Sequence, residues 1–160
     1  MTVVAALRAS VLFGTLPQPV LAQLAEWFVL RPTTAGEVLL REDEESARLY
    51  VVASGRVVVC KGVVGVTEAL VARVGPGDHL GEIDLVDGQT ATATVIAEED
   101  GVVIELAADR FRRMLVSDRP LFAHVARVLL TDMAVKVRRT NERVRETIAW
   151  GLDACGDGGA

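Results

Sequence analysis

The sequence predicts a mainly β domain with flanking helices, arranged as an antiparallel sandwich or barrel. Three observations carry this prediction. Short β-branched runs alternate with turns at spacings near ten residues over about residues 28–106, as in sandwiches and barrels. Runs of helix-forming residues precede this region, and a long stretch with helical periodicity at about 121–149 follows it.

Composition limits the possible function classes. The 160 residues are 51% apolar and only 4% aromatic, so we expect one domain over 1–150 with a core of Val, Leu and Ala, and a disordered tail at 151–160. The net charge of −5 argues against a broad nucleic-acid surface. Cys60 and Cys155 lie too far apart in sequence to form a metal motif or a disulfide framework. With no apolar run near the ~20 residues of a membrane span, a cytoplasmic protein without membrane contact is expected.

Two short helices are predicted before the strands. Residues 3–13 are good helix formers, and Gly14 ends the run. Pro17 then opens a second helix, because proline suits the first helical turn, and apolar residues recur along it at helical spacing. We expect both helices to cover a sheet.

Seven strands are predicted next. They end at Gly- and Asp-containing turns such as Ser54-Gly55, Asp87-Gly88 and Asp100-Gly101. An acidic loop tip at 43–46 is interpreted as a solvated turn. The predicted strands are 28–31, 37–40, 49–53, 56–61, 66–74, 94–97 and 102–106.

Helical periodicity returns after the strands. A short amphipathic helix is predicted at 109–116 and a long one at about 121–149. The long helix carries a 4-3 apolar spacing, the pattern of a coiled-coil seam. The seam either packs along its own barrel or pairs with a second copy, and its length favours a homodimer. The seam residues are Ala126, Leu130, Met133, Val137, Thr140, Val144 and Thr147.

The stretch 74–95 is the most informative for function. A Gly-Pro-Gly turn leads to Gly81-Glu82, which opens a short apolar turn of helix, and a hydroxyl-rich run then enters a strand. Backbone N–H groups gathered at such a turn form an anion site. The stretch holds the acids Asp78, Glu82, Asp84 and Asp87 but no Arg or Lys.

The order of these elements resembles the cyclic nucleotide-binding domain, and in particular the sensor half of the catabolite activator (cAMP receptor) family. The likeness covers roughly residues 7–148. It implies an eight-stranded, double-sheet β-roll of jelly-roll type with helices at both ends. The motifs that carry it are A-G-E-V-L-L-R-E-D-E (35–44), L-Y-V-V-A-S-G-R-V-V-V (49–59), G-P-G-D-H-L-G-E-I-D-L (75–85) and T-A-T-V (92–95).

The resemblance also implies a ligand site. Gly81 and the amide near Ile83 would approach the sugar and phosphate, and Glu82 would accept a hydrogen bond from the ribose 2′-hydroxyl. Thr92, followed by Ala93, stands where relatives place a small or hydroxyl residue beside the phosphate. Without the resemblance, Glu82 is simply a carboxylate favoured at a helix start.

A Thr-Ser pair on the long helix contacts the adenine in the catabolite activator branch. Thr140-Asn141 has the same local pattern here. Thr140 also fits a second interpretation, as a polar seam residue that sets the register of paired helices.

One position departs from the family pattern. Members that bind cyclic nucleotides have Arg-x-Ala-Thr-Val, whereas this chain has Ala91-Thr92-Ala93-Thr94-Val95. Because the arginine fork makes charge-assisted bonds to one phosphate, each worth about 1.5–3 kcal/mol, its loss would weaken binding by roughly 30-fold to 1000-fold or more. Asp84, where relatives usually have Ala, adds a negative charge nearby.

Three functions are compared. The first is a stand-alone regulatory sensor for a cyclic nucleotide, cAMP or cGMP, that acts through the long helix. The second is a degenerate domain that serves for dimerisation or for docking an unknown protein partner. The third, a metal-dependent enzyme of cupin shape, has only His79 and His124 as histidine ligands, so no catalytic residue, metal or cofactor is expected. The 160 residues contain no helix-turn-helix after the long helix, so no direct nucleic-acid contact is expected.

Overall fold

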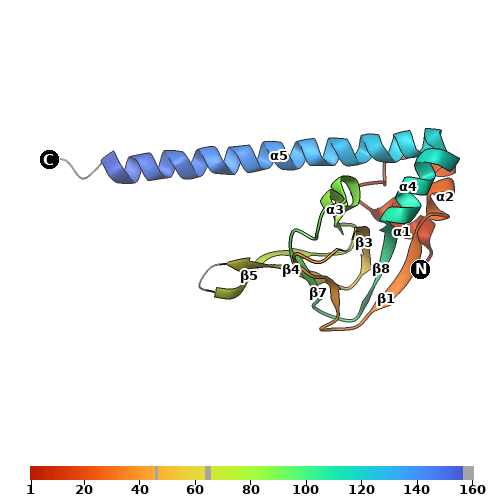
Figure 1. Ribbon diagram of the computed structural model, residues 1–160, viewed down its shortest axis with the longest axis horizontal. Helices are drawn as coiled ribbons and strands as arrows, with labels where there is room; N and C mark the ends of the chain where they lie inside the picture. The colour runs from red at the N-terminus through yellow and green to blue at the C-terminus, as the bar shows by residue number, and fades with distance from the viewer. Residues whose placement is uncertain (46, 64–65, 157–160) are drawn as a thin grey trace. The chain divides into compact units, whose positions relative to one another are not determined.

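The computed structural model describes residues 1–45, 47–63 and 66–156. Within them, eight strands form two four-stranded sheets in which neighbouring strands are antiparallel (Figure 1). This confirms the double-sheet β-roll. The first sheet has the order β1 (Val29–Thr33), β8 (Gly101–Ala107), β3 (Arg48–Ser54), β6 (His79–Leu80), and the second β2 (Val38–Leu40), β7 (Thr94–Ala97), β4 (Val57–Val63), β5 (Val66–Val74).

Strand β3, in the first sheet, is buried on both of its faces. Four consecutive residues, Leu49 to Val52, are at most 2% exposed. Because side chains alternate across a strand, Tyr50 and Val52 face the roll interior, where they belong to the main apolar cluster. Leu49 and Val51 face the other side, and α1 packs against β3. The remaining buried members of the interior cluster are Leu39, Leu40, Val57, Leu80, Ala91, Val95 and Val103.

The N-terminal helices differ from the prediction in length. Helix α1 (Val3–Ala9) stops four residues before the predicted end at residue 13. The reason is Ser10, whose hydroxyl donates to the Leu7 carbonyl and accepts from the Phe13 N–H, so the chain turns instead of continuing the helix. Helix α2 (Gln18–Ala25) follows, and Figure 1 shows α1, α2 and α4 (Ala108–Ser117) gathered near β1 and β8.

The chain divides into two compact units, Met1–Val125 and Ala126–Ala160. Helix α5 (Arg119–Gly156) begins in the first unit and makes up the described part of the second. It starts two residues before the predicted boundary. It extends to Gly156, and residues 157–160 lie outside the described residues. The disordered tail expected at 151–160 stays a prediction.

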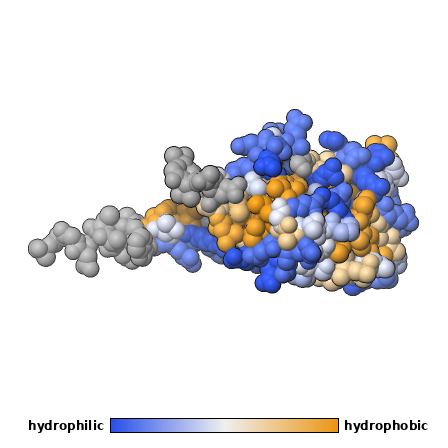
Figure 2. Space-filling model, turned by 90° about the horizontal axis from the view of Figure 1, so that it is seen from below, coloured by the Kyte–Doolittle hydropathy of each residue, from blue (hydrophilic) through white to orange (hydrophobic). Residues whose placement is uncertain are grey.

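The hydropathy of the helices and the polarity of one face are two further properties of the described residues. No helix of the described residues is long and apolar enough to cross a membrane. On the face seen in Figure 2, apolar and polar side chains are mixed.

Candidate ligand-binding site

Gly81 creates the turn at the centre of the site. Its φ is +80°, and a Cβ at this position would lie 2.0 Å from the Arg48 carbonyl oxygen. Only glycine accepts both the left-handed conformation and this close approach. Strand β6 leads into the turn and pairs Leu80 with Tyr50. The turn is thereby fixed against β3, and helix α3 (Glu82–Asp87) starts immediately after it.

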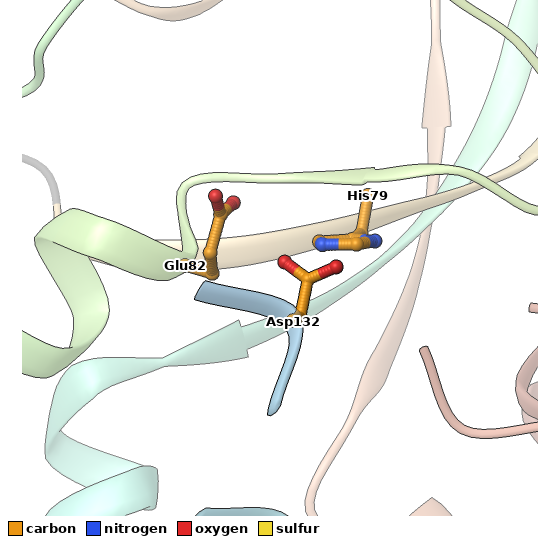
Figure 3. Close-up of side chains that lie close together, drawn as sticks. All are labelled: His79, Glu82 and Asp132. Atoms are coloured by element: carbon orange, nitrogen blue, oxygen red, sulfur yellow. The ribbon is translucent and has the colours of Figure 1, made fainter. Parts of the chain in front are cut away.

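The first turn of α3 directs two carboxylates inward. Glu82 is 5% exposed and Asp84 2% exposed, whereas Ile83 between them is 44% exposed. An oxygen of Glu82 and a ring nitrogen of His79 lie within 4.8 Å of one another (Figure 3). Asp132, drawn in the same figure, belongs to the second unit. Glu82 is therefore a buried acid at a helix start. Its predicted contact with a ribose hydroxyl stays a prediction.

Asp84 is the unusual acid of the site. Burial raises the pKa of its carboxyl group, and the nearby charge of Asp87 raises it further. The backbone N–H of Thr92 acts in the opposite sense and lowers this pKa. The Oδ1 atom of Asp84 is buried without a hydrogen-bond partner among the described residues. A negative charge on Asp84 is therefore costly here.

Ala91 faces the roll interior. It is 2% exposed and packs in the apolar cluster with Leu40 and Val95. Its backbone is fixed on both sides, because its N–H donates to the Glu44 carbonyl and its carbonyl accepts from the Asp43 N–H, each at 3.0 Å. A longer side chain at position 91 would therefore have its Cβ in the interior of the roll.

The residues after Ala91 are more accessible. Thr92 is exposed, and Ala93 is half-buried immediately before β7. Asp84 and Thr92 interact, so the structure brings the first turn of α3 and the Thr92 loop together. Residues 81–84 and 91–93 thus form one local site within the first unit.

Lys61, a basic residue that the sequence analysis does not include among the site residues, also lies beside Thr92. The Nζ atom of Lys61, on β4, donates to the Thr92 carbonyl at 2.9 Å. Arg73, on the neighbouring strand β5, is bound elsewhere, because its Nε donates to Glu98 at 2.9 Å. Pairing the predicted strands 56–61 and 94–97 antiparallel would have placed Lys61 near Thr92. The sequence therefore indicates the contact between Lys61 and Thr92 only through the pairing and register of these two strands.

The predicted base-contacting residues belong to the second unit. Thr140 and Asn141 are exposed on α5. The Thr140 hydroxyl donates to the Lys136 carbonyl at 3.0 Å, a bond to the preceding helical turn that threonine commonly makes in helices. Their role toward a ligand stays a prediction.

Comparison with known proteins identifies the family. Residues 30–118 match the model of the cyclic nucleotide-binding domain. The chain belongs to this family, whose description is that of a binding domain and names no catalytic activity. The resemblance predicted from the motifs is thereby confirmed.

Individual relatives agree with this assignment. The CRP-like cAMP-activated global transcriptional regulator of Mycobacterium tuberculosis is 30% identical over 145 residues, which are 88% of this chain and 61% of that protein. The regulatory domain of Toxoplasma gondii PKA, crystallised with cAMP, is 32% identical with a TM-score of 0.62, over 69% of this chain and 42% of the other. A cyclic nucleotide-binding domain from Methylobacillus flagellatus shares the fold, with a TM-score of 0.77 at 21% identity over 91% of this chain and 82% of the other. The chain thus spans about three fifths of the length of the Mycobacterium regulator.

Proposed function

We propose that this domain is a regulatory sensor that binds a cyclic nucleotide, with cAMP as the ligand. The observation that carries the proposal is the Gly81-Glu82 turn. It places a buried carboxylate at the start of α3, at the position where family members bind the ribose 2′-hydroxyl. Two relatives with at least 30% identity are described as cAMP-activated or were crystallised with cAMP, which favours cAMP over cGMP.

Glu82 and the neighbouring backbone would recognise the sugar. An ionised carboxylate only accepts hydrogen bonds, so it fits a hydroxyl donor and disfavours the approach of a phosphate. Gly81 permits the left-handed turn that leads into α3, because it has no Cβ. Thr92, which is exposed beside the turn, would donate its hydroxyl to a phosphate oxygen. The amide near Ile83 and the small Ala93 would complete the contact.

The output of the sensor would pass through α5. A ligand alters the state of the protein only if it binds one arrangement better than another, and Thr140-Asn141 would supply ligand contacts from this helix. The apolar seam residues Leu130, Val137 and Val144 are 63%, 59% and 50% exposed. Pairing of two copies along this seam would cover them, which supports a homodimer. A cytoplasmic location is part of the same proposal.

A second function is favoured by a different observation. Ala91 fills a place in the apolar core where relatives have an arginine, and the buried Asp84 carboxylate interacts with the Thr92 amide. Both features oppose a phosphate. In this alternative the domain binds no nucleotide and serves as a dimerisation or protein-docking module.

Thermal-shift titration separates the two functions. Under the sensor proposal, cAMP raises the Tm of the wild-type domain in a saturable way, because a ligand that binds only the native state stabilises it. Glu82→Gln should weaken this effect about tenfold, the loss expected for one hydrogen bond to a charged group. The matched ligand is 2′-deoxy-cAMP, which lacks the hydroxyl and should bind wild type and Glu82→Gln alike. A Tm unaffected by millimolar cAMP and cGMP would favour the docking module.

A further inference from the structure

The register between β4 and β7 determines the direction of the Lys61 side chain. Val59 pairs with Val95, and both pack in the interior of the roll. Lys61 lies two residues beyond Val59, so it shares the inward face of β4. The irregularity next to Val59 does not change this, because the extra residue, Val71, is on β5.

The Lys61 ammonium group lies directly beside the candidate phosphate end. It donates to the Thr92 carbonyl at 2.9 Å and lies 3.5 Å from a Glu42 carboxylate oxygen. The other Glu42 oxygen accepts from the Gly62 N–H at 2.8 Å, which fixes the carboxylate and hence the ammonium group. An ammonium group has three donors, and the Lys61 side chain is 53% exposed, so a ligand can reach it.

Arg73 provides the contrast on the same sheet. It pairs with Val58 in the β4–β5 register, and Val58 lies on the face of β4 opposite to Val59 and Lys61. The guanidinium group of Arg73 is bound by Glu98 at 2.9 Å. The two cations are therefore close in the sheet but lie on opposite faces.

We propose that Lys61 binds the cyclic phosphate of the ligand, in place of the arginine that the family pattern has at position 91. This inference rests on the proposed function. In the ligand-free domain the ammonium group is held by Thr92 and Glu42; in the complex one of its N–H groups donates to a phosphate oxygen beside Thr92. Lysine acts as a point charge without the two-pronged geometry of arginine, so the site binds its ligand more weakly than an arginine site.

Calorimetric titration of four variants with cAMP tests the assignment. Lys61→Met should weaken binding about 10- to 100-fold, the range for one charge-assisted hydrogen bond, whereas Lys61→Arg should bind at least as tightly as wild type. Arg73→Met removes the same charge from the opposite face and should bind like wild type. Lys61→Gln repeats the test with a polar side chain, and the Tm of each ligand-free variant checks folding.

A second ligand distinguishes a phosphate contact from a structural role. Adenosine lacks the phosphate, so its inhibition constant against a fluorescent cAMP analogue should be the same for wild type and Lys61→Met. Equal weakening of cAMP and adenosine would overturn the assignment. Equal cAMP binding by Lys61→Met and Arg73→Met would also overturn it and leave the proposed function intact. If neither wild type nor any variant binds cAMP, the proposed function and the inference both fail.

Discussion

The backbone N–H of Ala91 donates to the carbonyl of Glu44 at 3.0 Å, which fixes the Ala91 side chain toward the roll interior. This relationship makes position 91 suitable for restoring a phosphate arginine. Ala91→Arg should strengthen cAMP binding by about 30-fold or more, because a guanidinium group makes two charge-assisted bonds to one phosphate. Calorimetry on the wild type and the variant measures the change.

Two controls accompany this substitution. Thr90→Arg adds the same charge at the exposed neighbouring position and should leave affinity nearly unchanged. Ala91→Met adds length without charge and shows how far the apolar cluster tolerates a larger residue. Equal cAMP affinity for wild type and Ala91→Arg would show that position 91 does not face the phosphate.

Asp84 should make the stability of the domain depend on pH. Burial raises the pKa of its carboxyl group above the ordinary 3.8, and the nearby charge of Asp87 raises this pKa further. The native state therefore holds this proton more tightly than the unfolded state, and its contribution to stability is lost as pH rises from the ordinary pKa through the folded one. Asp84→Asn should raise the Tm at neutral pH by about 2–4 °C, the shift that 1 kcal/mol produces in a domain of this size.

The pH series is the control for this prediction. The Tm difference between wild type and Asp84→Asn should shrink as the pH falls below the ordinary pKa of Asp, where the carboxyl group is protonated in both states. Asp87→Asn, at an exposed position, should show a smaller difference. A constant difference across all pH values would mean that the charge of Asp84 is not its cause.

Gly81 and Gly88 form a matched pair at the two ends of α3. Both have positive φ, +80° and +69°, but a Cβ at Gly88 would meet nothing within 4 Å, whereas one at Gly81 would overlap the Arg48 carbonyl oxygen. Gly88→Ala should cost about 1–2 kcal/mol of unfolding free energy from the left-handed conformation alone. Gly81→Ala should cost about 1–3 kcal/mol more from the overlap. Urea unfolding measures both, and equal costs would contradict the close approach at Gly81.

The apolar seam of α5 predicts the oligomeric state. Val137 is on the seam and Val135 is not, yet both are exposed. Val137→Glu should convert a dimer to a monomer in sedimentation velocity, because a buried unpaired charge opposes helix pairing. Val135→Glu carries the same charge and should remain a dimer. A monomeric wild-type protein at high concentration would exclude pairing through the seam.

Most of the roll was predictable from the sequence, for physical reasons visible in particular elements. The β-branched runs 66–74 and 94–97 coincide with β5 and β7, because their turns are marked by glycine and small polar residues. Strand β6 was missed because two residues, His79 and Leu80, show no periodicity. The end of α1 was missed because the side chain of Ser10, and not a helix breaker, turns the chain there.

The site was predictable only where one local motif encodes it. The turn, Glu82 and the Ala91 departure all lie within one continuous stretch. Lys61 lies thirty-one positions before Thr92, and its contact depends on which strands pair and in which register. Local patterns do not contain that information, whereas the β4–β7 pairing does.

Calorimetric titration of the wild-type domain with cAMP tests the central claim most directly. We expect saturable binding of one cAMP per chain, weaker than in relatives that have the arginine. The absence of binding heat at millimolar cAMP and cGMP would contradict a nucleotide sensor and leave the docking module as the function of this domain.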